Sequence, residues 1–435
     1  DYRYSVDKFF IHLPMTINFK AAGFSPINNI ALKKIALKDD MHIIGIDRGE
    51  RNLIYVSVID TKGNIVEQRN FNIVNGIDYK EKLKQKELDR DNARKNWKEI
   101  GKIKDLKEGY LSLVVHEIAK LVVKYNAIIT MEDLNQGFKR GRFKVERQVY
   151  QKFETMLINK LNYLVDKDLA VDQEGGLLRG YQLTYIPESL KVLGRQCGYI
   201  FYVPAAYTSK IDPTTGFVAI FNYKGMTDKD FVTSFDSIKY DDERGLFAFE
   251  FDYENFVTHK VEMARNKWTV YTYGERIKRK FKNGLWDTAE KVDLTYQMRS
   301  ILEKYEIEYN KGQDILEQIE ELDEKAQNGI CKEIKYLVKD IVQMRNSLPD
   351  NAAEDYDAII SPVINNNGEF FDSTRGDEDK PLDADANGAY CIALKGLYEV
   401  MQIKKNWNEE TEFPRKELKI RHQDWFDFIQ NKRYL

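Results

Sequence analysis

The chain has 435 residues, of which 43% are hydrophobic and 31% are charged, and its formal net charge is −3. At roughly 150 residues per domain, this length predicts about three domains, with enough apolar mass for more than one hydrophobic core. A mean hydropathy of −0.56, without any apolar run near the ~18–20 residues that span a bilayer, excludes an integral membrane protein.

The start of the chain predicts a fragment of a larger protein. Its first residue is Asp1 rather than Met, and no signal segment follows it. Residues 1–20 alternate in polarity like one or two strands that are already under way. We therefore expect the chain to begin inside a longer polypeptide.

The next segments predict an antiparallel meander. Residues 41–46 form a short apolar run, residues 53–60 form a second strand, and residues 65–71 form a third after a Lys-Gly-Asn turn. The character then changes at residues 78–107, which are rich in charge and poor in large apolar side chains apart from Trp97. They predict an exposed, basic-biased helix or helix pair.

Helices and strands then alternate. Apolar residues at helical spacing predict a helix from Tyr110 to about Asn126, followed directly by a β-branched strand that ends at Glu132. After a basic loop come a long helix over residues 145–165 and a buried strand over residues 199–204. The predicted order of the core is therefore β-β-β-α-β-α-β.

The remaining sequence predicts an insertion and a return to the core. Residues 205–383 are aromatic and of mixed polarity, which favours an inserted α/β module. Within it, residues 276–282 read RIKRKFK, and this stretch is either a solvated face or a patch that contacts phosphates. Residues 386–403 predict a helix with Asp385 at its start, and residues 421–432 predict a last amphipathic helix.

Three acids occupy comparable places in these elements. Asp47 ends the first strand, Glu132 ends the strand after the first long helix, and Asp385 begins a late helix. They are too far apart in sequence for a local helix or loop to join them, so only a shared sheet could do so. In an RNase H-like arrangement, the first and fourth strands lie parallel and their ends meet beside the start of the late helix. Each acid alone is also typical of a turn or cap residue.

Clustered carboxylates predict a divalent metal site. Three carboxylates at one point repel one another unless a cation lies between them. Oxygen ligands without His or Cys favour Mg²⁺ or Mn²⁺ over zinc. Two such ions about 3.5–4 Å apart activate water and stabilise the leaving oxygen of a phosphodiester. We expect Asp47 to bridge the ions, with Glu132 and Asp385 on the outer sides.

Other catalytic devices find no support in the sequence. The five histidines have no paired metal-ligand spacing, no Gly-x-Ser-x-Gly or Walker-type loop is present, and no two cysteines form a Cys-x-x-Cys pair. The cysteine pattern excludes a disulfide scaffold and a zinc ribbon, and favours reduced thiols in a cytoplasmic protein. The histidines are His12, His42, His116, His259 and His422, and the cysteines are Cys197, Cys331 and Cys391.

The residues around the three acids resemble one family over essentially the whole chain. That family is the type V-A CRISPR effectors, which are RNA-guided DNA nucleases, and the resemblance is to their C-terminal third. The motifs occur in the same order and are GIDRGERNLIYVSVID (45–60), ITMEDLNQGFKRGRFKVERQVYQKFE (129–154), PAAYTSKIDPTTGF (204–217), QMRNS (343–347), SPV (361–363) and DADANGAYCIALKG (383–396).

The resemblance implies an α/β fold: an RNase H-like (RuvC-like) mixed sheet flanked by helices, with an inserted α/β Nuc domain. It divides the nuclease into three sequence pieces. The implied ranges are the end of an upstream wedge or oligonucleotide-binding domain at 1–40, RuvC-like part I at 41–79, a bridge helix at 80–97, part II at 98–204, the Nuc domain at 205–383 and part III at 384–435.

The resemblance also implies roles for single residues. Asp47, Glu132 and Asp385 match the catalytic, metal-binding acids, with Mg²⁺ as cofactor and Mn²⁺ as a substitute. Arg345 matches a Nuc-domain arginine needed for efficient cleavage, and Asp357 matches a polar Nuc residue near the same cleft. The resemblance further implies that Trp97 anchors the bridge helix and that residues 132–147 form a lid over the acids.

We therefore expect the nuclease lobe of an RNA-guided DNA endonuclease, an enzyme of the bacterial cytoplasm without membrane attachment. Guide RNA and target DNA would bind through the full effector, and single-stranded DNA would reach the cleft, with collateral cleavage of single strands. Two alternatives are a catalytically silent nucleic-acid-binding scaffold and a guide-independent transposase or resolvase. Transposon-associated relatives often carry Cys-x-x-Cys pairs in the insert, where this chain has only Cys331.

Overall fold

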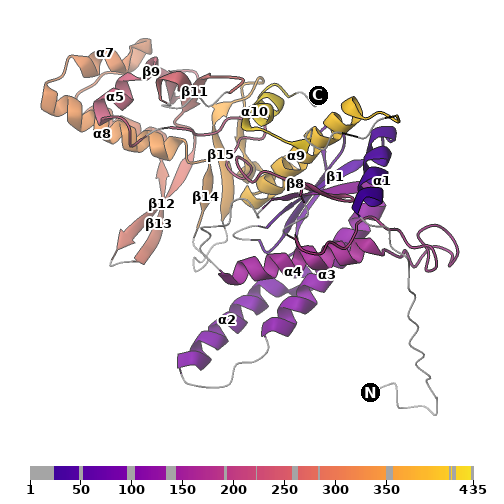
Figure 1. Cartoon of the computed structure of the whole chain (residues 1–435). Coiled ribbons are helices and arrows are strands. Elements are labelled where there is room, and N and C mark those ends of the chain that lie inside the picture. Colours follow the sequence, from indigo (N-terminus) through magenta and orange to yellow (C-terminus); the bar gives the residue numbers. More distant parts are fainter. Residues whose placement is uncertain are drawn as a thin grey trace.

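The structure is a computed structural model, shown in Figure 1. Two expected segments, the strands before residue 20 and the basic loop at 135–143, lie outside the residues that it describes, and so does Trp97. The described residues are 24–48, 52–95, 103–133, 144–190, 194–221, 223–256, 263–282, 285–348, 356–410, 413 and 418–432.

A mixed sheet forms the centre of the larger part of the molecule, with strand order β3-β2-β1-β6-β8-β7. Strands β1, β2 and β3 form the predicted antiparallel meander, and β6 lies parallel to β1 on its other side. Strand β8 is parallel to β6, and the short β7 is antiparallel to β8. The strands are β1 (His42–Asp47), β2 (Tyr55–Ile59), β3 (Ile65–Asn70), β6 (Ala127–Glu132), β7 (Gln196–Cys197) and β8 (Ile200–Val203).

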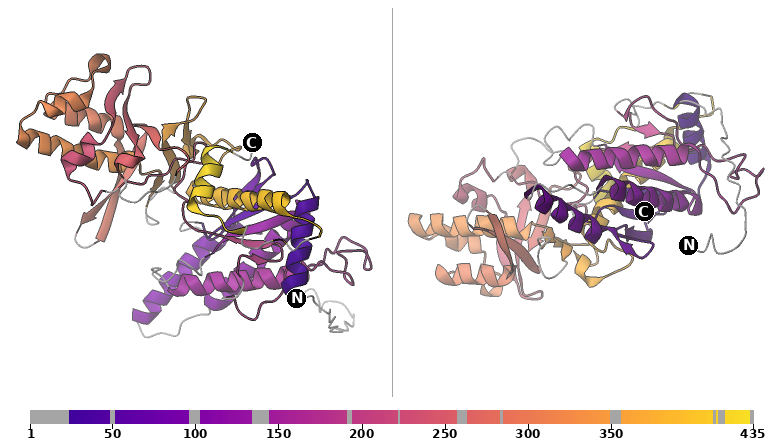
Figure 2. Two further views of the ribbon diagram at one scale, coloured as in Figure 1. Left: turned by 45° about the horizontal axis from the view of Figure 1, so that its top comes forward. Right: turned by 90° about the horizontal axis from the view of Figure 1, so that it is seen from below.

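Helices cover both faces of this sheet. Helix α9 (Ala384–Asn406) packs across one face, and α3 (Ile103–Lys124) and α4 (Lys144–Asn162) pack on the other (Figures 1 and 2). Because β1 is covered on both sides, it reads as a continuous apolar run rather than as an alternating one. Gly45 in β1 lets α9 approach, since a Cβ built there would lie 2.1 Å from the carbonyl oxygen of Ala389. This arrangement confirms the predicted α/β class.

The strands expected for the end of an upstream domain at 1–40 do not include residues 24–37. These residues form helix α1 (Phe24–Leu37), and Ile27, Ala31 and Ile35 are buried in the same hydrophobic cluster as the central sheet. Their spacing of four residues places them on one helical face, which is the physical reason for the helix. The expected charged segment at 78–107 is a helix pair, made of α2 (Tyr79–Lys95) and the first turn of α3.

The segment between β8 and α9 is built from further strands and helices, as the sequence predicts, and extends to the upper left in Figure 1. Its own hydrophobic cluster has buried residues from Phe217 to Val363. The strands are β9 (Ser237–Asp241), β10 (Leu246–Asp252), β11 (Lys267–Tyr271), β12 (Glu275–Lys282), β13 (Leu285–Asp293), β14 (Arg345–Ser347), β15 (Asp357–Ile364) and β16 (Phe370–Asp372). The α-helices are α5 (Asp228–Thr233), α6 (Leu294–Lys304), α7 (Ile315–Glu320) and α8 (Glu324–Ile341).

The remaining elements are short or terminal. The basic stretch 276–282 lies in β12, which forms a hairpin with β13. Helix α10 (His422–Gln430) is the predicted last amphipathic helix. Among the described helices, none is both long and apolar enough to cross a bilayer. The other short elements are β4 (Ile73–Val74), β5 (Ile77–Asp78), η4 (Tyr253–Asn255), η5 (Asn310–Gly312) and η6 (Ser373–Arg375).

Candidate active site

The three predicted acids come together at one edge of the central sheet. Asp47 is the last residue of β1 and Glu132 the last residue of β6, and the preceding residues, Ile46 and Met131, are register partners in the parallel pair. Asp385 lies in the first turn of α9 and is fully buried. The carboxyl ends of parallel neighbouring strands meet at the same edge, and α9 begins over that edge. The sheet therefore joins acids that are distant in sequence.

Asp47 is at the centre of this cluster. Burial raises the pKa of Asp47 well above its usual value, and the neighbouring charges of Glu132 and Asp385 raise it further. The guanidinium groups of Arg345 and Arg48 lower the pKa of Asp47 but do not cancel these effects. An ionised Asp47 is thus a carboxylate that a bound cation would stabilise.

Asp385 is held through both carboxylate oxygens. The backbone N–H and the side-chain amide of Asn52 donate to Oδ2, at 2.8 and 3.0 Å. Arg345 donates from Nη2 to Oδ1 at 2.9 Å. Asn52 is itself oriented by Asn72, whose Nδ2 donates to the Asn52 Oδ1 at 2.8 Å. Sequence analysis missed both asparagines; the only signal is that Asn52 immediately follows the Gly-Ile-Asp-Arg-Gly-Glu-Arg segment.

Arg345 and Asp357 also reach this cluster, from neighbouring strands of the insert. Ser347 of β14 is the register partner of Asp357 in β15, so Arg345 lies two residues from that pair. Arg345 Nη2 is 3.2 Å from Asp357 Oδ2 and 2.9 Å from Asp385 Oδ1. The guanidinium therefore bridges a carboxylate of the insert and a carboxylate of α9, and the structure places all five predicted site residues in one group.

Glu132 is positioned by a chain of contacts that sequence analysis did not find. Its Oε1 accepts a hydrogen bond from the Thr208 hydroxyl at 2.8 Å. The loop that carries Thr208 is held by Lys395 of α9, whose Nζ donates to the carbonyls of Pro204 and Ala206, each at 2.6 Å. Burial lowers the pKa of Lys395 to about 8. A lysine in the Gly-Ala-Tyr-Cys-Ile-Ala-Leu-Lys helix thus supports an acid on another element.

Asp383 is a further acid beside the cluster. It is the N-cap of α9, and its Oδ1 accepts a hydrogen bond from the backbone N–H of Ala386 at 2.7 Å. Burial raises the pKa of Asp383 to about 6, and the charges of Asp385 and Asp357 act in the same direction. The cap fixes the first helical turn, which carries Asp385. The Asp-Ala-Asp spacing was the available sequence signal.

Arg276, the first residue of the basic stretch in β12, has neither of the two roles predicted for that stretch, a solvated face or a contact to phosphate. Arg276 is fully buried, and its guanidinium donates to the carbonyls of Tyr273 and Ile341, each at 3.0 Å. Burial lowers the pKa of Arg276 to about 10. Arg276 is therefore a structural link inside the insert, neither a solvated residue nor a phosphate contact.

The chemistry of the acids fits a hard divalent cation. All three predicted ligands offer carboxylate oxygens. Burial and the neighbouring charges of Glu132 and Asp385 raise the pKa of Asp47, so an ionised Asp47 gains from a bound cation. Among the described residues, no group of three His, Cys, Asp or Glu side chains has metal-binding geometry. Arg345 supplies a positive charge at Asp385 Oδ1. Cation binding at Asp385 would therefore compete with this guanidinium.

Comparison with known proteins agrees with this geometry. The sequence model of one protein family, the RuvC nuclease domain, matches residues 21–434. The match begins just before α1 and ends beyond α10. It therefore spans the central sheet, the insert and all five residues of the cluster.

Proposed function

Because the chain belongs to the RuvC nuclease domain family, we propose that it is the nuclease lobe of an RNA-guided DNA endonuclease of the type V-A CRISPR kind. The observation that carries the proposal is the convergence of Asp47, Glu132 and Asp385 at one edge of the sheet. The family itself establishes a nuclease; the ordered sequence motifs around the acids support guided cleavage of DNA. Single strands that reach the cleft are cut as well, as collateral cleavage.

The three acids would hold two Mg²⁺ ions, for which Mn²⁺ can substitute, and such ions activate water and stabilise the leaving oxygen of a phosphodiester. Asp47 would hold the ions together with Glu132 and Asp385, whose charges both act on the pKa of Asp47. Arg345, held by Asp357, is placed to exchange its bond to Asp385 for a phosphate oxygen. Thr208 keeps Glu132 oriented while the strand binds.

The proposed partners follow from the same assignment. Guide RNA and target DNA bind through the full effector, where base pairing reads the sequence and the protein contacts the backbone. The proposed compartment is the bacterial cytoplasm. Both alternatives remain distinguishable from this proposal, because a silent scaffold binds strands without cutting them and a transposase or resolvase needs no guide.

The test is a cleavage assay on single-stranded DNA with Mg²⁺, Ca²⁺ or EDTA, and with an RNA strand of the same sequence as a second substrate. We expect cleavage of DNA in Mg²⁺ only. Asp47→Ala, Glu132→Ala and Asp385→Ala should each reduce the rate by at least about 10³-fold, and the double variants should lose little more, since the three act as a unit.

Asp60→Asn is the matched control. Asp60 follows β2 and caps a turn, where its Oδ1 accepts from the backbone N–H groups of Lys62 and Asn64, so the variant should cut at the wild-type rate. An acid variant that retains a tenth of the wild-type rate would remove that residue from the site. If the full effector binds a strand but does not cleave it, the scaffold is favoured. If guide RNA leaves the cleavage rate unchanged, the guide-independent nuclease is favoured.

A further inference from the structure

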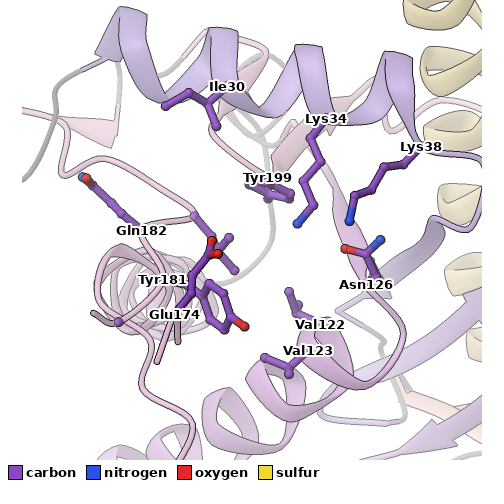
Figure 3. A pocket seen from close by; sticks show the side chains of 13 residues that line it. Ile30, Lys34, Lys38, Val122, Val123, Asn126, Glu174, Tyr181, Gln182 and Tyr199 are labelled. Carbon is purple, nitrogen blue, oxygen red and sulfur yellow. The ribbon is translucent and has the colours of Figure 1, made fainter. Parts of the chain in front are cut away.

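A cavity lies at the edge of the central sheet where β6 begins, opposite to the edge that carries the three acids. Its volume is about 590 Å³, and Figure 3 shows it between α1 and the end of α3. Ala127, which lines it, is the first residue of β6, whereas Glu132 is the last. Five residues of extended strand separate these positions by ~16 Å. The cavity is therefore distinct from the candidate active site.

Two lysines provide the cavity with positive charge. Lys34 lies in the last turn of α1, and Lys38 directly follows the helix, with its backbone N–H donating to the carbonyl of Lys34 at 3.1 Å. Figure 3 shows both side chains pointing into the cavity. Burial lowers the pKa of Lys34, and the charge of Lys38 lowers it further. Among the described residues, neither ammonium group has a hydrogen bond or a salt bridge. Glu174 and Asp40 raise the pKa of Lys34 in turn, but neither forms a hydrogen bond or a salt bridge with its ammonium group among the described residues. Two close ammonium groups that no carboxylate holds directly favour binding of an anion.

The rest of the lining is aromatic, apolar and amide-bearing. The ring of Tyr199 lies beside Lys34, with 5.1 Å between Nζ and the ring centroid. Ile30 and Val123 also line the cavity and are 54% and 37% exposed, so the apolar surface is open to a ligand. Asn126 adds a side-chain amide, and its buried Nδ2 has no hydrogen-bond partner in the described part of the chain.

We infer that this cavity binds a nucleotide, with its phosphate on Lys34 and Lys38 and its base against the apolar and tyrosine-lined side. A phosphate matches two ammonium groups that face the same space. Tyr199 is only 4% exposed. The base would therefore lie against Ile30, Val123 and the half-buried Tyr181. Stacking on a tyrosine does not depend on which base is present. The volume lies within the ~300–1,000 Å³ typical of small-ligand pockets. Glu174 is the one acidic residue of the lining and opposes the phosphate.

This site goes beyond the proposed function, because it requires no cleavage and no metal. Two ligands offer the same phosphate and base, namely a free nucleotide and a nucleotide within a single strand. If the source is a strand, the cavity would hold a part of it about the length of β6 away from the acids.

The test is titration calorimetry on the full chain in EDTA, with three probes: inorganic phosphate, deoxyadenosine 5′-monophosphate and a four-nucleotide single-stranded DNA. We expect saturable binding of the monophosphate, at least about 10-fold tighter than that of inorganic phosphate, because only the monophosphate uses the apolar side. A tighter complex with the four-nucleotide strand would identify a strand as the source, and equal affinity would identify a free nucleotide.

Matched variants test the contacts. Lys34→Gln and Lys38→Gln should each weaken monophosphate binding by about 10-fold or more, since each removes a charge-assisted contact. Lys33→Gln is the control, because Lys33 is on the same helix but is exposed and pairs with Glu409 at 3.9 Å. Glu174→Gln should strengthen the binding of inorganic phosphate. Unfolding midpoints of all variants show whether the fold is kept.

Three results would overturn the inference: no saturable binding of the monophosphate, equal binding of inorganic phosphate and monophosphate, or equal effects of Lys34→Gln and Lys33→Gln. Asp47→Ala separates this inference from the proposed function. It should abolish cleavage while leaving the monophosphate affinity unchanged, so that loss of one property does not imply loss of the other.

Discussion

Gly388 has no side chain, and Asp47 occupies the space in which one would lie. A Cβ built at Gly388 would be 2.4 Å from Asp47 Oδ2, a distance that forces one of the two to move. Gly388→Ala should therefore displace Asp47 and lower the cleavage rate by at least about 10²-fold, the cost of misplacing a reacting group. Cleavage kinetics and thermal unfolding together measure this effect.

Gly109 is the matched control for this substitution. It lies within α3, and a Cβ built there meets no other atom within 4 Å. Gly109→Ala should leave the cleavage rate unchanged and raise the free energy of unfolding by up to about 1 kcal/mol, because alanine is the better helix former. Wild-type cleavage by Gly388→Ala would contradict the packing argument.

Lys395 gives the chain a pH dependence of known sign. Its folded pKa of about 8 lies below the ordinary value of 10.5. Between these two values the unfolded chain binds a proton that the folded chain does not, so the contribution of Lys395 to stability rises with pH. The free energy of unfolding of the wild type, minus that of Lys395→Met, should increase between pH 8 and 10.5, by at most about 3 kcal/mol.

Urea unfolding at several pH values measures this difference. Lys405→Met is the control, because Lys405 is exposed on the same helix. The difference between wild type and Lys405→Met should not change with pH over the same range. A Lys395→Met difference that stays flat or falls with pH would show that the ammonium group is not disfavoured by burial.

At the scale of elements, the decisive contact joins β14 of the insert to the first turn of α9. Arg345 is 15% exposed in its side chain and Asp385 is 0% exposed, so their ion pair is withdrawn from water. Arg345→Ala should slow cleavage by about 10²-fold through loss of strand positioning. It should not weaken Mg²⁺ binding, because Arg345 is a competitor of the cation at Asp385 rather than a ligand.

A stability measurement gives this prediction a second readout. Without Arg345, Asp385 becomes a buried charge that lacks its partner. Mg²⁺ should therefore raise the unfolding temperature of Arg345→Ala more than that of the wild type. Arg375→Ala, at an exposed arginine of the insert that donates to Tyr273, should respond like the wild type. A fall in Mg²⁺ affinity parallel to the fall in activity would assign Arg345 to the metal site.

At the scale of the whole molecule, the chain has two large, separate hydrophobic clusters. Ile43 belongs to the cluster of the central sheet and Ile334 to that of the insert, and both are fully buried. Ile43→Ala and Ile334→Ala should each cost about 2–5 kcal/mol. In calorimetry, each should lower a different unfolding transition, which tests the predicted domain boundaries at 205 and 383. One transition that both variants lower equally would show that the clusters unfold together.

The sequence by itself determined the three strands of the meander, the strand that ends at Glu132 and the long helices. Local periodicity carries that information, because the burial of a strand or of a helical face depends on neighbours that alternate at 2 or 3.6 residues. It missed α1, where Ile27, Ala31 and Ile35 have helical spacing, because the polarity of the preceding residues 1–20 alternates as in a strand. It also pointed to Asp47, Glu132 and Asp385 as candidates, although each alone is typical of a cap or turn.

Only the tertiary structure decided which other groups face these acids. Asn52 and Thr208 contact the acids from two separate loops, and Lys395 of α9 holds the loop of Thr208. No periodicity in the sequence records such meetings, since they depend on how the sheet, α9 and the insert pack against one another. The same holds for the cavity opposite the acids, where Lys34 on α1 meets Tyr199 beside β8. Long-range packing places these charges together, and local sequence cannot.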